Sequence, residues 1–211
     1  MRQSVMFALF VVCVWAAAAA PNPQPVALPV PQTSGGKPLM QALRERASRR
    51  EFAPDPLPPQ VLANLLWAAW GINRPDHGGR TAPSPMNRQE MDLYVALADG
   101  AFLYDAKNNR LQPVAGDDLR ALTGLQPFVG SAPVNLIYVA RAGGGSAEDR
   151  AMYGGIQAGL ISQNVYLFCA SEGLATVVRG MVNREPLAKA LKLPSDQRII
   201  LAQTVGYPAK P

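Results

Sequence analysis

The chain has 211 residues, of which 48% are hydrophobic and 17% are charged. That composition supports one ordinary globular domain and excludes disorder throughout. The formal net charge is +5 at pH 7, but no block of Lys and Arg alternates with aromatic residues, so the charge does not indicate a nucleic-acid groove. A small anionic ligand would suit this basicity at least as well.

The N-terminus is typical of an exported protein. Arg2 precedes an apolar run, residues 5–20, that ends in five alanines. This pattern predicts a signal peptide over residues 1–20, cleaved among residues 17–20, and a periplasmic destination. The run is short for a membrane span, and an uncleaved anchor is the alternative. Residues 21–37 are rich in Pro and Gly, which predicts a flexible linker outside the fold.

The folded domain is expected over residues 38–211 and begins with two helices. Residues 39–47 have a short amphipathic pattern, and residues 60–70 have apolar side chains at helical spacing after a proline pair. Gly71 is a natural stop. Residues 72–88 have no periodicity, so they are either a functional loop or a surface insertion.

Three short strands should follow as a β-meander, at residues 91–98, 101–105 and 111–114. Asp117 is expected to cap a short helix that runs to Leu122. Residues 133–140 predict a buried strand.

The longest predicted helix covers residues 148–171. Three glycines in its middle each cost about 1 kcal/mol relative to alanine, so a close neighbour is expected there: Gly154, Gly155 and Gly159. The Gln163–Asn164 pair is polar in an apolar stretch, and we assign it a structural role. A strand over residues 174–178, a helix over 185–191 and a strand over 198–205 complete an α+β fold with a mainly antiparallel sheet flanked by helices.

Few residues are available for metal or triad chemistry. Cys13 lies in the apolar N-terminal run, so the folded part is expected to keep only Cys169, which allows neither an intrachain disulfide nor a cysteine metal cluster. A triad would have to use His77, the one histidine, in a Pro/Gly-rich loop. We predict neither kind of site.

Residues 46–52 are the most informative stretch. They hold four charged residues just before four closely spaced prolines. A solvated helix end explains the charges alone. Guanidinium groups and a hydroxyl beside a stiffened loop would also explain the prolines, because such groups bind phosphate.

Five motifs in a fixed order carry a resemblance. They are Arg-x-Ser-x-Arg-x-Phe at residues 46–52, Ala-Pro-Ser-x-x-Asn-x-Gln at 82–89, Gly-x-x-x-Gln-Asn at 159–164, Gly-Leu-Ala-Thr at 173–176 and Val-Gly-Tyr-Pro at 205–208. Together they resemble the nitroreductase family of FMN-dependent oxidoreductases, and within it the branch of peptide dehydrogenases that oxidise azoline rings. The resemblance covers residues 39–208.

The resemblance implies a homodimer with FMN at the subunit interface. The residues that match the first motif, Arg46, Ser48 and Arg50, would surround the phosphate, and Lys210 is the basic residue after the last strand. Arg49 and Glu51 alternate with them and are expected in solvent. The residues that match the second motif would come from the partner subunit and line the flavin: Pro83, Ser84 and Asn87.

The ring end of the site is implied further along the chain. Gln126 would place an amide near the flavin. Val178, Arg179 and Gly180 would lie along the ring, with the N–H of Gly180 donating to flavin N5. Arg179 has no usual counterpart in the family, and it would either favour the reduced flavin by its charge or point to solvent.

The activity implied is ping-pong hydride transfer from a reductant such as NAD(P)H to a nitro, quinone or enone-like acceptor on a small molecule or peptide. The flavin supplies the chemistry, so no catalytic side chain is predicted. Because NAD(P)H and FMN are scarce outside the cytoplasm, the signal peptide favours an alternative: an exported flavin- or ligand-binding protein with little turnover.

Overall fold

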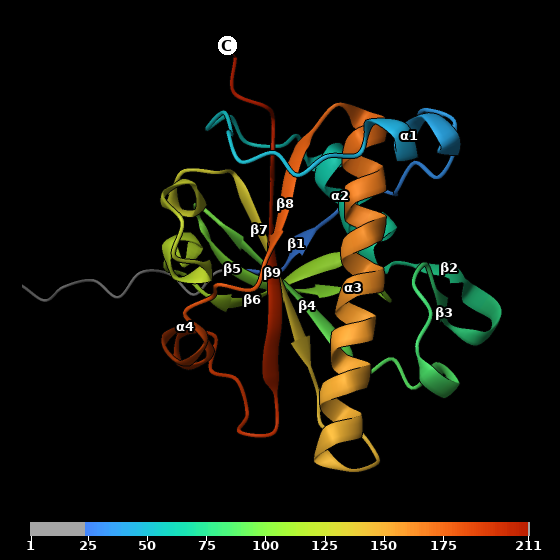
Figure 1. The fold of residues 1–211 in the computed structure, drawn as a ribbon, viewed down its shortest axis with the longest axis vertical. Helices are drawn as coiled ribbons and strands as arrows, with labels where there is room; N and C mark the ends of the chain where they lie inside the picture. The colour runs from blue at the N-terminus through green and yellow to red at the C-terminus, as the bar shows by residue number, and fades with distance from the viewer. Residues whose placement is uncertain (1–23, 211) are drawn as a thin grey trace, which may run out of the picture.

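The protein folds around one open antiparallel sheet in a computed structural model that describes residues 24–210 (Figure 1). The predicted signal peptide and Cys13 lie outside the described residues. Every neighbouring pair of described strands in this sheet is antiparallel, and the order is β1-β6-β5-β4-β7-β9-β8. The strands are β1 Val26–Ala27, β4 Met91–Leu97, β5 Gly100–Asp105, β6 Arg110–Ala115, β7 Val134–Ala140, β8 Ala175–Arg179 and β9 Arg198–Gly206.

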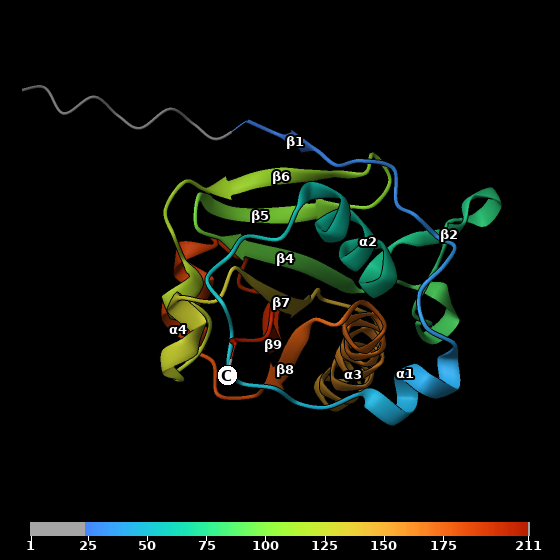
Figure 2. The same ribbon diagram turned by 90° about the horizontal axis from the view of Figure 1, so that it is seen from above.

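Helices cover both faces of the sheet (Figure 2). One face carries α1 (Leu39–Glu45), α2 (Pro59–Trp70) and α3 (Ala147–Glu172). The other carries α4 (Arg184–Ala190) with the 3₁₀ helices η3 (Arg120–Thr123) and η4 (Pro127–Gly130). A separate apolar core lies under each helical layer. The α+β prediction is confirmed, and β8 is an edge strand of the sheet that residues 24–210 form.

The long helix α3 begins and ends where its sequence predicts. Ser146 and Asp149 form a reciprocal capping box, and Gly173 ends the helix in the left-handed conformation with φ 73°. Gly154 packs against Ala140 and Ile200, as expected of a glycine at a close contact. Gly155 and Gly159 differ, because a Cβ added at either one would meet no atom within 4 Å.

The predicted loop at residues 72–88 contains more regular structure than expected. Residues 72–88 form a small hairpin of β2 (Ile72–Arg74) and β3 (Gly79–Arg80), with the 3₁₀ helices η1 (Pro75–His77) and η2 (Pro85–Asn87). The predicted Asp117 cap is wrong: the N-cap of η3 is Leu119, and no side-chain cap forms there. The neighbouring Asp118 carboxylate instead accepts hydrogen bonds from Arg120.

Residues 24–38, called the strap below, correct the prediction of a free linker. β1 pairs with the edge strand β6. The Asn109 side-chain amide donates to the carbonyl oxygens of Leu28 and Pro29 at 3.0 and 2.8 Å. Lys37 Nζ donates to Glu45 Oε2 at 2.7 Å. The Pro/Gly composition hides these attachments, because a segment without its own core can still complete the edge of a neighbouring sheet.

Candidate functional site

The predicted phosphate stretch runs from the end of α1 to the edge of β8. The backbone N–H of Arg49 donates to the carbonyl of Thr176 on β8 at 3.0 Å. Glu51 then accepts from the N–H of Ala209 at 3.2 Å. These contacts bring Lys210 beside the same stretch. Residues 46–52, residues 178–180, Tyr166 and Lys210 are called the β8 edge below.

The cations of the β8 edge have no acidic partners. Arg46 is half-buried, whereas Ser48, Arg50 and Lys210 are exposed. Among residues 24–210 none of their cationic groups forms an ion pair with a carboxylate. Cations without acidic partners beside a hydroxyl make a suitable site for a phosphate. Arg49 and Glu51 are exposed, as predicted for the residues that alternate with the ligands.

Tyr166 joins the two ends of the β8 edge, and this role was not predicted from the sequence. Its hydroxyl lies 2.7 Å from Ser48 Oγ and accepts from the N–H of Val178 at 3.0 Å. The Arg46 guanidinium lies over its ring, 5.2 Å from the centroid. Tyr166 is buried on α3, two residues after the Gln-Asn pair. A helical tyrosine carries no signal of such a role until the fold places β8 beside it.

The backbone of β8 directs alternate groups away from the sheet. In an antiparallel pair, alternate residues direct both backbone groups toward or away from the neighbouring strand. Thr176 and Val178 bond outward, to Arg49 and Tyr166, so the same alternation aims the N–H of Gly180 outward. Gly180 is exposed, and a Cβ added there would meet no atom within 4 Å. A flat ligand can therefore approach this backbone closely.

Arg179 points inward, so the predicted alternative of a solvent-facing side chain is wrong. The side chain is 4% exposed. It donates to the Thr123 carbonyl at 2.7 Å and to Asn135 Oδ1 at 2.9 Å. Burial lowers the pKa of Arg179 to about 10, which leaves the guanidinium charged at neutral pH.

Gln126 lies at the same end of β8. Gly124 lies close to the side chains of Arg179 and Gln126. A Cβ added at Gly124 would collide with Arg179 Nη1 and lie 2.8 Å from Gln126 Oε1. Gln126 Oε1 is buried without a hydrogen-bond partner in the described structure. The predicted amide is thus near the ring end of the β8 edge.

The structure does not bring Pro83, Ser84 and Asn87 to the β8 edge of their own chain. They follow the β2–β3 hairpin, and α3 lies between this hairpin and β8 (Figure 1). The loop holds a defined shape: Met86, Asn87 and Gln89 have φ of 48°, 53° and 53°, a conformation that non-glycine residues adopt only where the surroundings impose it.

Gln89, which was part of the predicted motif but not of the predicted site, fixes that shape. Its N–H donates to Ser84 Oγ at 3.0 Å, and its side-chain amide donates to the carbonyl of Gly78 at 2.8 Å and to Asn87 Oδ1 at 3.0 Å. Asn87 and Met86 remain exposed at the tip.

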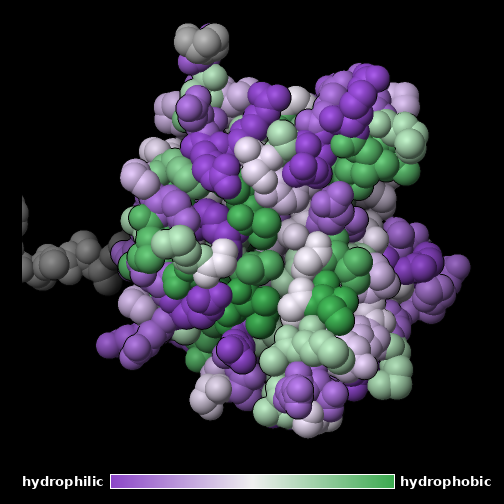
Figure 3. All heavy atoms as spheres, viewed as in Figure 1, coloured by the Kyte–Doolittle hydropathy of each residue, from purple (hydrophilic) through white to green (hydrophobic). Residues whose placement is uncertain are grey.

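An apolar stripe is exposed along α3. Met152, Ile156 and Leu160 recur at every fourth position and are 49%, 48% and 39% exposed. Gly155 and Gly159 lie on the same helical face, and Figure 3 shows green side chains along α3 beside further apolar atoms over the sheet. Exposed apolar stripes of this kind are typical of interaction surfaces.

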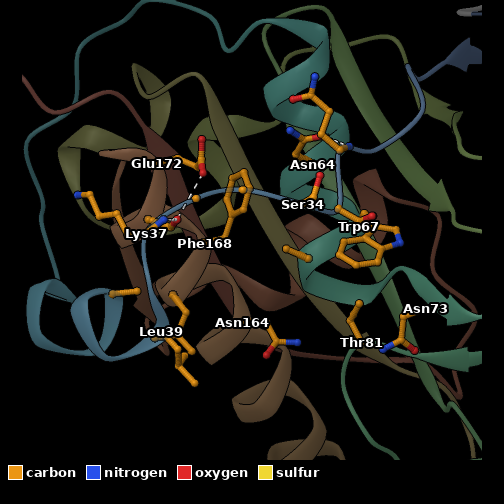
Figure 4. A pocket seen from close by; sticks show the side chains of 18 residues that line it. Ser34, Lys37, Leu39, Asn64, Trp67, Asn73, Thr81, Asn164, Phe168 and Glu172 are labelled. Atoms are coloured by element: carbon orange, nitrogen blue, oxygen red, sulfur yellow. Dashed lines mark hydrogen bonds between the residues drawn. The ribbon is translucent and has the colours of Figure 1, made fainter.

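A well-defined hollow lies elsewhere in the described structure. A recess of about 520 Å³ lies between α1, α2, α3 and the strap. Trp67 and Phe168 form apolar walls, with Asn64 and Ser34 near one end and Asn73, Thr81 and Asn164 near the other (Figure 4). Gln163 is exposed. The residues that line the recess include none of those predicted to bind FMN.

The described residues also bear on metals and membranes. Residues 24–210 contain no group of His, Cys, Asp and Glu side chains placed to hold a metal ion. No helix within this range combines the length and the hydropathy needed to cross a membrane.

Three comparisons with known proteins agree on one family. The model of the Nitroreductase family matches residues 43–207. A crystal structure of a candidate nitroreductase from Ralstonia eutropha JMP134 is 43% identical, covers 92% of this chain and 94% of its own, and superposes with a TM-score of 0.86. A candidate nitroreductase of Methanocaldococcus jannaschii is 29% identical over 168 residues, which are 74% of this chain and 84% of the relative.

A more distant likeness concerns the fold alone. The Escherichia coli microcin synthetase McbBCD complex, solved with truncated pro-MccB17 bound, contains a chain that is 18% identical with a TM-score of 0.70. The match covers 79% of this chain and 70% of that one.

Proposed function

This chain belongs to the nitroreductase family of flavin-dependent oxidoreductases, and from that premise we propose that it binds FMN along the β8 edge. The observation that carries the proposal is the row of groups there: cations without counter-ions, then the Tyr166 hydroxyl, then the outward N–H of Gly180. A long ligand with an anionic end and a flat polar ring matches this order. FMN is such a ligand.

Different residues of the chain would bind the phosphate and the ring of FMN. Arg46, Ser48, Arg50 and Lys210 hold the phosphate by charge-assisted hydrogen bonds. Tyr166 keeps Ser48 and Val178 at a fixed separation, so both ends of the ligand are positioned together. Gly180 donates its backbone N–H to the ring, and Gln126 provides a nearby amide. When bound, FMN supplies hydride acceptance and donation at N5.

The working unit is a homodimer. The α3 stripe of Met152, Ile156 and Leu160 is the surface for a second copy, and Gly155 and Gly159 allow the two helices to approach closely. Pro83, Ser84 and Asn87 then reach the flavin of the other subunit, since they lie across α3 from their own β8. The rigid loop shape that Gln89 imposes is the form expected of residues that must fit a partner's site.

The reaction is ping-pong hydride transfer. FMN held along the β8 edge would accept a hydride from a reductant such as NAD(P)H and would then pass it to a nitro, quinone or enone-like acceptor. The fold shared with a microcin synthetase chain, solved with a peptide precursor, keeps a peptide substrate of the azoline type within the proposal. We also propose that the protein is exported and that its signal peptide is cleaved. The intact mass of protein isolated from its native compartment tests the cleavage.

Colour is the first test. Purified protein should be yellow, release FMN identified by mass, bleach with NADPH and recover its colour in air. Protein that stays colourless and is not stabilised thermally by added FMN contradicts the proposal.

The recess of about 520 Å³ favours a second candidate, a ligand-binding protein with little turnover. Its size is within the range of small-molecule sites. Yellow protein that dithionite bleaches but neither NADH nor NADPH can reduce would support binding, or a different electron donor, over the proposed reaction.

A further inference from the structure

Arg179 is a buried cation without a counter-ion. Its guanidinium donates to three neutral acceptors, the carbonyl and hydroxyl of Thr123 and the amide oxygen of Asn135. Arg179 Nε has no partner within the described part of the chain. No described carboxylate forms an ion pair with it. Burying a charge without an opposite charge costs free energy. A neutral side chain with the same hydrogen bonds would therefore serve a purely structural role at a lower desolvation cost.

The surroundings are shaped around this charge. Gly124 has an extended backbone with φ −177°, which any residue can adopt, yet a Cβ there would collide with Arg179 Nη1. Asn135 is fully buried, and it turns its oxygen toward the guanidinium while its amide donates to the carbonyl of Val129 at 2.8 Å. Thr204 Oγ1 donates to the same Asn135 oxygen at 2.6 Å. The network thus supplies the guanidinium with acceptors but no negative charge.

The charge lies at the ring end of the proposed site. Arg179 immediately precedes Gly180, whose N–H faces outward, and its side chain lies in the protein interior on the side of η3 and η4. A side chain that is 4% exposed has little opportunity to bind a ligand directly. It can act on a neighbouring ligand through its electric field, which low-dielectric surroundings weaken less than water does.

We propose that Arg179 is an electrostatic positioning residue that raises the reduction potential of the bound flavin. The inference rests on the proposed FMN site and deepens it. A hydride brings two electrons and one proton to the ring, while the donor loses the same two electrons and one proton. The ring therefore gains one negative charge. A fixed positive charge beside it binds the reduced form more tightly than the oxidised form.

The alternative is that Arg179 only ties η3 to β8. A structural tie would stabilise the fold and the affinity for both redox forms equally, and it would leave the potential unchanged. The two roles therefore separate in a measurement of potential, independently of enzyme turnover.

The test compares Arg179→Gln with Arg179→Lys and wild type, by equilibrating the FMN-loaded proteins with a reference dye. Arg179→Gln should weaken reduced-flavin binding about tenfold relative to oxidised-flavin binding, which lowers the two-electron midpoint by about 30 mV. Arg179→Lys should retain most of the wild-type potential. Arg184→Gln is the matched control, since it removes one exposed guanidinium that bonds to carbonyls of β9.

Each outcome of this test supports or overturns the electrostatic role of Arg179. An unchanged potential in Arg179→Gln, with lowered thermal stability, overturns the inference and leaves the FMN site intact. A wild type with no affinity for FMN overturns the proposed function and the inference together. Should Arg179→Gln fail to fold, Gly124→Ala gives the second measurement: the added methyl displaces the guanidinium, and an unchanged potential there also overturns the inference.

Discussion

The β8 edge and the recess under the strap differ in two properties, the volume that each encloses and the charge that each leaves unpaired. The recess encloses about 520 Å³, and the ammonium of Lys37 at its rim is paired with Glu45 at 2.7 Å. The β8 edge is largely open surface, yet none of its cations forms an ion pair with a carboxylate of residues 24–210. Volume and unpaired charge therefore identify different places in one chain.

In the proposed homodimer, the β8 edge would supply the binding groups and the second subunit would supply the enclosure. A surface with unsatisfied charge and an apolar stripe nearby is suited to be half of a site. In the recess, by contrast, the ammonium of Lys37 already has a carboxylate partner. Substitutions at the two regions should therefore have unequal effects on FMN binding.

The largest effect is expected from Ile156→Glu in the α3 stripe. A carboxylate buried without a partner costs several kcal/mol, so the dimer should dissociate and FMN affinity should fall more than a hundredfold, as measured by light scattering and flavin fluorescence. Thr33→Glu, on the strap beside the recess, is the control. A dimeric Ile156→Glu protein with full flavin content would contradict the proposed interface.

Arg46→Ala and Arg50→Ala should come next. Each removes a charge-assisted hydrogen bond to the phosphate that contributes about 1.5–3 kcal/mol. The FMN dissociation constant should therefore rise roughly ten- to hundredfold, as measured by titration of the apoprotein. Arg49→Ala should bind FMN normally, because only its backbone contacts β8. Full flavin occupancy in both Arg46→Ala and Arg50→Ala would show that the phosphate assignment is wrong.

Tyr166→Phe should have an intermediate effect on stability. It leaves the N–H of Val178 and the Ser48 hydroxyl without their shared partner, a cost of about 1–3 kcal/mol to be read from denaturant unfolding. FMN affinity should fall as well. Tyr153→Phe on the same helix keeps the ring that Arg88 contacts and should change neither quantity. Equal unfolding free energies for the two variants would remove Tyr166 from the site.

The smallest effect is expected at the strap. Hydrogen bonds from Lys37 and then Gln41 lower the pKa of Glu45 below its ordinary value of 4.5. A lowered pKa stabilises the fold above pH 4.5, and this contribution is lost as the pH falls through the folded-state pKa. The effect is small, because the pair is exposed to solvent.

Hydrogen exchange can isolate that small effect. Amides of residues 30–38 should exchange faster at pH 3 than at neutral pH after correction for intrinsic rates, while amides of α3 should not. Glu45→Gln should abolish the difference. A pH dependence that persists in Glu45→Gln would place its source elsewhere.

Much of the fold is readable from local pattern. The helix expected at residues 60–70 is α2, Pro59–Trp70, and that expected at 148–171 is α3, Ala147–Glu172. Each predicted strand lies within a few residues of its observed bounds. These elements have strong periodicity and clear caps, so the information that specifies them lies within a few neighbouring residues.

The strap, Tyr166 and Arg179 could not be predicted, because each depends on a partner far away in the chain. The strap is fixed by Asn109 and Glu45, Tyr166 by Ser48 and Val178, and Arg179 by Thr123 and Asn135. No spacing in the sequence records such pairs.

By itself the sequence determined the order of the main helices and strands and the family, since periodicity, capping and motif order are properties of neighbouring residues. Only the tertiary structure decided that the strap belongs to the domain, that β8 is left as an edge strand, and that Arg179 is buried while Arg50 is exposed. The physical reason is that burial and hydrogen-bond partners are set where distant segments meet, and these decide whether an arginine side chain is buried in the protein or faces solvent.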